Sequence, residues 1–261
     1  MRLVILAALL GFLTWFQFGQ DSSMPATVQR IADLAEARPV RSVLIVGNSR
    51  SYFNDMPGML RKLANSRASA INLEIETSMI PGGSFEMHWS HGRTKRLLGD
   101  GWDEVILQGE SGAQTSREQA FRFQGFGAEL AGISRVREGK PTLVVNWPYD
   151  RSVFRDYEGY DRAEHLAFLS RTNSELAQHA HLKRINLAGL WESVKTRHPS
   201  LAMTTDGNHP TLAGSYLYAL AIYAHVTGQP VSALDYVPYG LDQDVAKELR
   251  MAVDSFPVSL S

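Results

Sequence analysis

Short apolar runs alternate along the chain with longer segments in which apolar residues recur every three or four positions. Runs of Val, Ile and Leu are typical of buried strands, and the recurring pattern is typical of amphipathic helices. The expected strands are residues 42–46, 71–77, 104–108, 142–146 and, with the weakest pattern, 184–187. The expected helices are residues 27–37, 56–66, 85–98, 117–135, 162–179, 211–226 and 242–253.

Strands that alternate with helices of this length form βαβ units with a parallel sheet. We therefore predict an α/β fold, a three-layer α/β/α sandwich around a mostly parallel, five-stranded sheet. Ligands bind such folds beyond the carboxyl ends of the strands. Small and polar residues follow the first four expected strands, and residues 148–160, which lack periodicity, are expected to form a loop over the sheet edge or over the site.

The N-terminus has a pattern of its own. Sixteen uncharged residues, 3–18, follow Met1 and Arg2, which is typical of a bacterial export signal. The stretch is slightly short for a membrane-spanning helix, and no clear cleavage site follows it. Residues 1–20 are interpreted as a signal peptide or an N-terminal membrane anchor, and the alternative is a buried first helix. Both main interpretations predict an exported protein that is periplasmic, secreted or anchored to the membrane.

Composition narrows the classes of function. A chain of 261 residues with 44% hydrophobic content suits one α/β domain with a sizeable core. The net charge of −1 and the absence of a dense basic run argue against a nucleic-acid partner. The chain has no cysteine, which excludes disulfides, thiolate catalysis and metal sites built from cysteine.

A small polar segment, Gly-Asn-Ser-Arg-Ser at residues 47–51, follows the first expected strand. A serine on a tight turn after a buried strand is exposed, and the early N–H groups of a following helix stabilise an oxyanion. Ser49 and Ser51 are therefore both candidate nucleophiles. The alternative is that both serines only cap the next helix.

A second polar segment, residues 204–210, precedes the long helix expected at 211–226. Asp206 and His209 lie three residues apart in a turn that contains a glycine. Such a turn brings a carboxylate onto one imidazole nitrogen and leaves the other nitrogen free as a base. The alternative is an ordinary loop in which Asp206 is a turn former.

Together, Gly-Asn-Ser-Arg-Ser at 47–51 and Asp-x-x-His at 206–209 resemble the first and last blocks of the SGNH (GDSL-type) hydrolase superfamily. The resemblance covers roughly residues 41–228 and implies an SGNH/flavodoxin-like fold, with residues 24–261 as a catalytic domain. It implies Ser49 as the nucleophile, His209 as the general base and then acid, and Asp206 as the carboxylate that orients His209.

The resemblance also implies an oxyanion hole in which the N–H of Ser49 acts with a glycine N–H after the second strand. We predict Gly83 for this glycine, with Gly82 as the near alternative. The usual third block, Gly-x-Asn-Asp, is absent, and Gln-Gly-Glu-Ser stands at residues 108–111. This run is similar to one in sialate and acetylxylan esterase branches. The amide of Gln108 has the donor chemistry of the missing Asn, and we predict that it takes that role.

Three further side chains are candidates for substrate binding, Glu110, His88 and Trp147, because each follows or adjoins an expected strand end. His88 and His91 are spaced like metal ligands on a helix but have no obvious carboxylate partner. His179 and His181 sit near a helix end. We predict no metal site, and the resemblance implies chemistry without a cofactor.

The expected function is that of a serine esterase that cleaves ester bonds through an acyl-enzyme, with O-acyl, in particular acetyl, groups on carbohydrate as the expected target. The expected partner is a small-molecule or polysaccharide ester. Two alternatives stay open: an O-acetyltransferase acting on an envelope or exported polysaccharide, and a non-catalytic carbohydrate-binding module on the same fold. The sequence leaves open the acyl chain length, the natural alcohol and the oligomeric state.

Overall fold

The computed structural model describes residues 38–66, 68–110, 116–150 and 161–261. The chain divides into two compact units, Met1–Pro39 and Val40–Ser261, and the fold described below is that of the second unit. The N-terminal segment, the helix expected at 27–37 and most of the loop expected at 148–160 lie outside the described residues. None of the described helices combines the length and the apolar character that a bilayer crossing requires.

The described part of the second unit contains a six-stranded sheet in the order β2-β1-β3-β4-β5-β6. The first five strands are parallel, as predicted, and β6 is antiparallel to β5. The extra strand has only two residues, too few to leave a sequence pattern. The strands are β1 (Val40–Gly47), β2 (Asn72–Met79), β3 (Glu104–Leu107), β4 (Pro141–Val144), β5 (Lys183–Ile185) and β6 (Ser259–Leu260).

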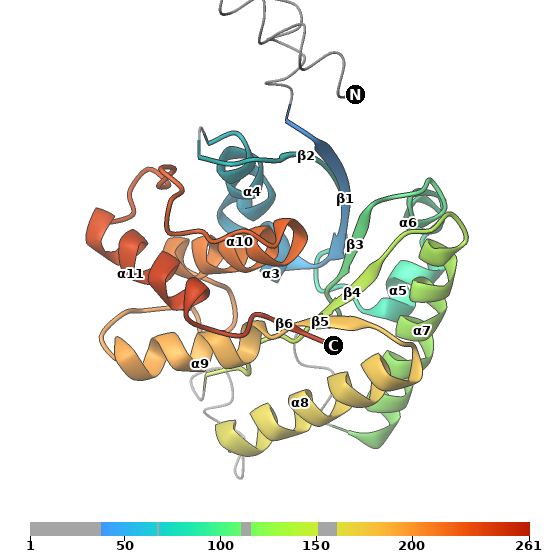
Figure 1. The fold of residues 1–261 in the computed structure, drawn as a ribbon. Helices are drawn as coiled ribbons and strands as arrows, with labels where there is room; N and C mark the ends of the chain where they lie inside the picture. The colour runs from blue at the N-terminus through green and yellow to red at the C-terminus, as the bar shows by residue number, and fades with distance from the viewer. Residues whose placement is uncertain (1–37, 67, 111–115, 151–160) are drawn as a thin grey trace, which may run out of the picture. The chain divides into compact units, whose positions relative to one another are not determined.

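Two helical layers cover the sheet (Figure 1), and the alternating side chains of β1 divide between them. Val43 and Ile45 pack into the core beneath α4 (Met56–Ala64), α9 (Leu187–Arg197), α10 (Leu212–Thr227) and α11 (Gln243–Asp254). Leu44 and Val46 pack on the other face, beneath α5 (Phe85–Ser90), α6 (Gly92–Leu98), α7 (Arg117–Arg135) and α8 (Arg162–His179). The predicted α/β/α sandwich is confirmed.

Residues 85–98 form two helices rather than the single one expected. His91 has an extended backbone, with φ −91° and ψ 110°, and separates α5 from α6. The break turns Thr94 inward, where its hydroxyl lies 2.8 Å from the hydroxyl of Ser78 on β2. Burying a polar group is tolerated when it is hydrogen-bonded, and this contact satisfies the buried Thr94 hydroxyl.

The strand register sets the position of the site. Val46 of β1 lies opposite Leu107 of β3, and Gly47 lies opposite Met79 of β2. The three strands therefore end at one level, and their polar exits begin side by side. The order of the strands reverses between β1 and β3, the point at which open α/β sheets bind their ligands.

Candidate active site

The first candidate residue stands at the end of β1. Asn48 caps the short helix α3 (Ser49–Tyr52) by accepting a hydrogen bond from the N–H of Arg50, so that Ser49 is the first helical residue. A Cβ on Gly47 would lie 2.7 Å from Ser51 Oγ, closer than real Cβ contacts allow. The sequence folds into this tight exit because Gly47 leaves room for the side chains packed against it.

The turn that carries His209 is closed by an isolated bridge between Thr204 and Pro210. Inside it, Asp206 Oδ1 accepts hydrogen bonds from the backbone N–H of Asn208 at 2.9 Å and of His209 at 2.7 Å. This arrangement is an Asx turn, the local chemistry that Asp favours in loops. It brings the second carboxylate oxygen toward the imidazole of the same turn.

Ser49, His209 and Asp206 form a continuous relay. His209 Nε2 lies 2.9 Å from Ser49 Oγ, and His209 Nδ1 lies 2.6 Å from Asp206 Oδ2. A carboxylate only accepts, so the Nδ1 proton donates to Asp206 and Nε2 keeps a lone pair for the Ser49 hydroxyl. The ring of Phe53 stacks on the imidazole at 4.2 Å and fixes its plane. The structure thus brings together the three residues predicted to act as a triad.

The electrostatics of Asp206 suit the role of an orienting carboxylate. Burial raises the pKa of Asp206, but hydrogen bonds from the His209 side chain and from two backbone N–H groups outweigh it and lower the pKa to about 2. Asp206 is therefore ionised at neutral pH. The side chains of Asp206 and His209 are 53% and 23% exposed, which leaves the relay open to solvent on one side.

The two serines of the first motif differ in position. Ser51 is fully buried, and its hydroxyl donates to Gln108 Oε1 at 2.8 Å and lies 3.3 Å from the Tyr218 hydroxyl. Ser49 is 9% exposed and faces His209. Of the two candidates, Ser49 alone contacts His209, and Ser51 holds the turn through its hydrogen bond to Gln108.

Gln108, predicted to be an oxyanion donor, braces the turn that carries Ser49. Its Oε1 accepts from the N–H of Asn48 at 2.9 Å as well as from Ser51, and its Nε2 donates to the carbonyl of Gly109. The Asn48 amide also donates to Gly109, at 3.2 Å, and to the carbonyl of Gly83 at 3.0 Å. Asn48 and Gln108 therefore tie the ends of β1 and β3 together, a function that the sequence pattern did not indicate.

The other predicted oxyanion donors are the backbone N–H groups of Gly83 and Ser49. The Gly83 N–H donates to the carbonyl of Ile80 at 2.9 Å and so closes a turn in which Gly82 has a φ of +62°. The N–H of Ser49 opens α3, where the first N–H groups of a helix have no carbonyl partner within it. The oxyanion roles of Ser49, Gly83 and Gln108 all stay predictions.

Two residues predicted to bind substrate are buried instead. His88 is fully buried; its Nε2 proton donates to the carbonyl of Gly47 at 3.1 Å, and its Nδ1 lies 3.2 Å from Thr94 Oγ1. Burial lowers the pKa of His88 to about 4, so the ring is neutral at pH 7. Trp147 is also fully buried and stacks on Trp191 at 4.1 Å. The prediction that these side chains line a substrate cleft is wrong, because their rings pack in the core.

Glu110, the third predicted substrate contact, is 7% exposed and accepts a hydrogen bond from the N–H of Phe85 at 3.2 Å. Burial raises the pKa of this carboxyl group. The hydrogen bond from the first N–H of α5 favours the carboxylate, but this effect is smaller than that of burial. The residues that follow it, 111–115, lie outside the described part of the chain, and a contact with substrate stays a prediction.

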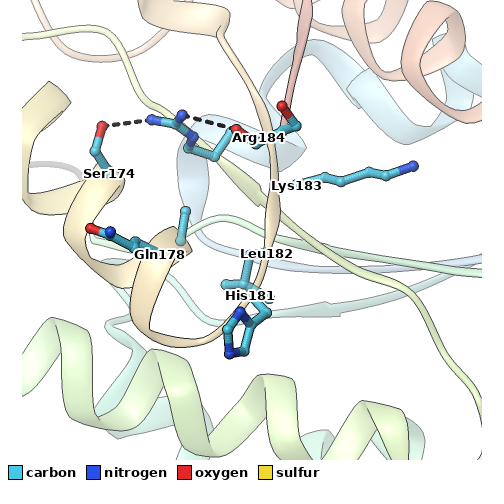
Figure 2. A pocket seen from close by; sticks show the side chains of 8 residues that line it. Ser174, Gln178, His181, Leu182, Lys183 and Arg184 are labelled. Carbon is cyan, nitrogen blue, oxygen red and sulfur yellow. Dashed lines mark hydrogen bonds between the residues drawn. The ribbon is translucent and has the colours of Figure 1, made fainter.

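No group of three or more His, Asp or Glu side chains is placed to hold a metal ion within the described ranges. A cavity of about 600 Å³ lies elsewhere, between the end of α8 and the start of β5 (Figure 2). Arg184 extends from β5 across it to the hydroxyl of Ser174 on α8. None of the triad residues lines this cavity, which belongs to the amino end of β5 rather than to the carboxyl edge of the sheet.

No family model matches the chain, and no curated protein matches it. Several solved structures do match it. A DUF4886 family protein from Bacteroides uniformis is 20% identical with a TM-score of 0.68, and the match covers 83% of this chain and 94% of that chain. A proposed SGNH hydrolase from Slackia heliotrinireducens is 20% identical with a TM-score of 0.59, over 73% of this chain and 100% of that chain.

A catalytic variant of an acetylxylan esterase from Geobacillus stearothermophilus is 11% identical with a TM-score of 0.57, and the match covers 77% of this chain and 100% of that chain. At these identities the likeness establishes the fold. The second unit has the fold of the SGNH hydrolases, as the two motifs indicated.

Proposed function

We propose that this protein is a serine esterase that cleaves ester bonds through an acyl-enzyme. The observation that carries the proposal is the relay in which Ser49 Oγ lies 2.9 Å from His209 Nε2 and His209 Nδ1 lies 2.6 Å from Asp206 Oδ2. Serine is a weak nucleophile unless a base accepts its proton, and the relay supplies an oriented base at the edge of the sheet where ligands bind.

In the proposed reaction, Ser49 Oγ attacks the ester carbonyl carbon while its proton passes to His209 Nε2. The ionised Asp206 stabilises the imidazolium that forms. The tetrahedral intermediate collapses when the bond to the alcohol breaks, and His209 returns the proton to the leaving alkoxide. Water then attacks the acyl-enzyme by the same route and releases the acid and free Ser49.

The developing oxyanion needs donors aimed at it. We propose the backbone N–H of Ser49 as one of them, since it begins a helix and has no partner there. Gly83 and Gln108 are proposed as the others. The Gly83 N–H would have to leave its present acceptor, Ile80 O. Gln108 Nε2 carries two protons, and its contact with Gly109 O uses one of them.

The substrate is proposed to be an O-acyl ester, in particular an acetyl group on a carbohydrate. The similar fold of the acetylxylan esterase supports this choice, and the partly exposed relay suits an ester carried by a large alcohol. The apolar segment at residues 3–18 supports an exported location, anchored or secreted, in which a polysaccharide ester would be accessible.

The test compares wild type with Ser49→Ala on 4-nitrophenyl acetate and on an acetylated oligosaccharide. The proposal expects hydrolysis of both by wild type and a loss of about 10³-fold or more in kcat for Ser49→Ala. An enzyme that acylates but turns over only when a sugar acceptor is added would be a transferase. If wild type and Ser49→Ala bind the oligosaccharide equally and neither hydrolyses it, the esterase proposal fails.

A further inference from the structure

Arg50, the residue that follows Ser49, forms a hydrogen bond to the turn that carries His209. Arg50 Nε donates to the side-chain oxygen of Asn208 at 2.9 Å. Trp147 Nε1 donates to the backbone oxygen of the same residue at 3.0 Å. Both oxygens of Asn208, the residue directly before His209, are therefore bound by side chains from outside the turn.

Arg50 is itself fixed in place. Its side chain is fully buried, and Nη1 donates to the carbonyl of Trp147 at 2.5 Å. The guanidinium lies 4.4 Å from the centre of the Trp147 ring and 4.9 Å from that of Tyr149. Planar stacking and forked donation are properties that Arg has and Lys lacks. Arg50 therefore presents Nε to Asn208 from a rigid position.

This contact joins the two halves of the relay. Arg50 is one peptide bond from Ser49, and Asn208 is one peptide bond from His209, although 158 positions separate them in the chain. The outer face of the turn is open to solvent, because the Asp206 side chain is 53% exposed. The position of His209 relative to Ser49 therefore depends on the contacts of the buried side of the turn, which include the Phe53 ring on the imidazole and the hydrogen bonds to Asn208.

We propose that Arg50 is a positioning residue for the base: through its hydrogen bond to Asn208 it sets the alignment of His209 with Ser49. The inference rests on the proposed esterase function for its kinetic consequence. Misplacement of a reacting group by about 1 Å can cost on the order of a hundredfold in rate. Loss of the contact should therefore lower kcat more than it changes KM, since Arg50 is fully buried and the side-chain oxygen of Asn208 is bound to Arg50.

The test uses Asn208→Ala, Asn208→Asp, Arg50→Lys and the double variant Arg50→Lys with Asn208→Ala. Asn208→Ala should lower kcat by about tenfold to a hundredfold with KM within about twofold. Asn208→Asp keeps an acceptor for Arg50 and should recover kcat to within about threefold of wild type. The double variant should be no slower than the slower single variant, because both changes remove the same contact between Arg50 and Asn208.

A matched control separates positioning from stability. Asn186, like Asn208, accepts a hydrogen bond with its side-chain oxygen, but the donor is the backbone N–H of Gly189 at 3.1 Å, and Asn186 caps α9 instead of bracing the turn that carries His209. Asn186→Ala should lower the melting temperature and leave kcat unchanged. If Asn208→Ala has wild-type kcat, or if the losses of the two single variants multiply in the double variant, the inference is overturned.

A spectroscopic measurement decides the inference even if the proposed function fails. The Nδ1 proton shared between His209 and Asp206 should give a low-field proton NMR signal that is absent from His209→Gln. In Asn208→Ala the turn is no longer held by Arg50, so this proton should exchange faster with water and its signal should broaden or vanish. In Asn208→Asp, which keeps an acceptor for Arg50, the signal should persist. An inactive wild type would refute the esterase proposal, whereas an unchanged signal in Asn208→Ala would refute the positioning role of Arg50.

Discussion

Asp206→Asn exchanges one oxygen of the relay for an NH₂ group and leaves the shape of the side chain almost unchanged. Asp206 Oδ1 accepts from the N–H groups of Asn208 and His209 at 2.9 and 2.7 Å. In the variant, the amide oxygen must stay on these two donors, because an NH₂ group there would face two N–H groups. The NH₂ then takes the place of Oδ2, 2.6 Å from His209 Nδ1.

An NH₂ group donates, so His209 Nδ1 has to accept and the ring proton moves to Nε2. Nε2 then cannot accept the proton of Ser49. The same change in the triad of a serine protease costs about 10⁴-fold in kcat through the wrong tautomer, which corresponds to about 5 kcal/mol of transition-state stabilisation. We expect a loss on the order of 10³- to 10⁴-fold in kcat here, with KM little changed.

The assay is ester hydrolysis, with kcat and KM measured separately and urea unfolding measured in parallel. The free energy of unfolding should change by less than about 1 kcal/mol, since the amide oxygen keeps both backbone hydrogen bonds. Asp244→Asn, in the first turn of α11, is the control for the same substitution at an exposed site. If Asp206→Asn keeps more than about a tenth of the wild-type kcat, the assigned tautomer and the orienting role are wrong.

Three further predictions concern the residues around the relay. Trp147→Ala should lower the free energy of unfolding by about 3–5 kcal/mol, and a change in sugar affinity at unchanged stability in urea unfolding would contradict its place in the core. Gly47→Ala should cost about 1–3 kcal/mol in the same assay and reduce activity, because the added Cβ meets Ser51 Oγ at 2.7 Å; wild-type stability would disprove the close approach. His88 has a pKa lowered from 6.5 to about 4, so its contribution to stability is complete above pH 6.5 and is lost as the pH falls toward 4. The decline in unfolding free energy between pH 7 and 4 should therefore be smaller in His88→Asn by about 1–3 kcal/mol, and an equal decline would refute the neutral buried ring.

The candidate triad could be predicted from sequence because each half depends on local turn chemistry. Asp206 and His209 lie in one Asx turn, and Ser49 follows directly from a buried strand. The parallel strands were also predictable, since continuous apolar runs of four or more residues mark strands that are covered on both faces. Bringing the two turns together then required only that the strands end at one level.

Other features depend on contacts that no local pattern records. Trp147 follows the fourth expected strand, at the edge of the sheet where ligands bind, and is predicted to contact substrate for that reason, but its ring stacks in the core on Trp191, far along the chain. The burial of His88 could not be predicted either, since it depends on the contact of the His88 ring on α5 with the carbonyl of Gly47 at the end of β1. The contact between Arg50 and Asn208 spans 158 positions and has no spacing signal. Only the residue types, a large cation directly after a candidate nucleophile, could have drawn attention to it.

Covalent labelling of the nucleophile is the decisive measurement for the assignment of Ser49. Wild type is treated with a fluorophosphonate, and the modified residue is located by mass spectrometry of the peptides. We expect one adduct, on Ser49, with no labelling of Ser49→Ala and much slower labelling of His209→Ala. Labelling of Ser51, or equal labelling of wild type and Ser49→Ala, would contradict the assignment of Ser49 as the nucleophile.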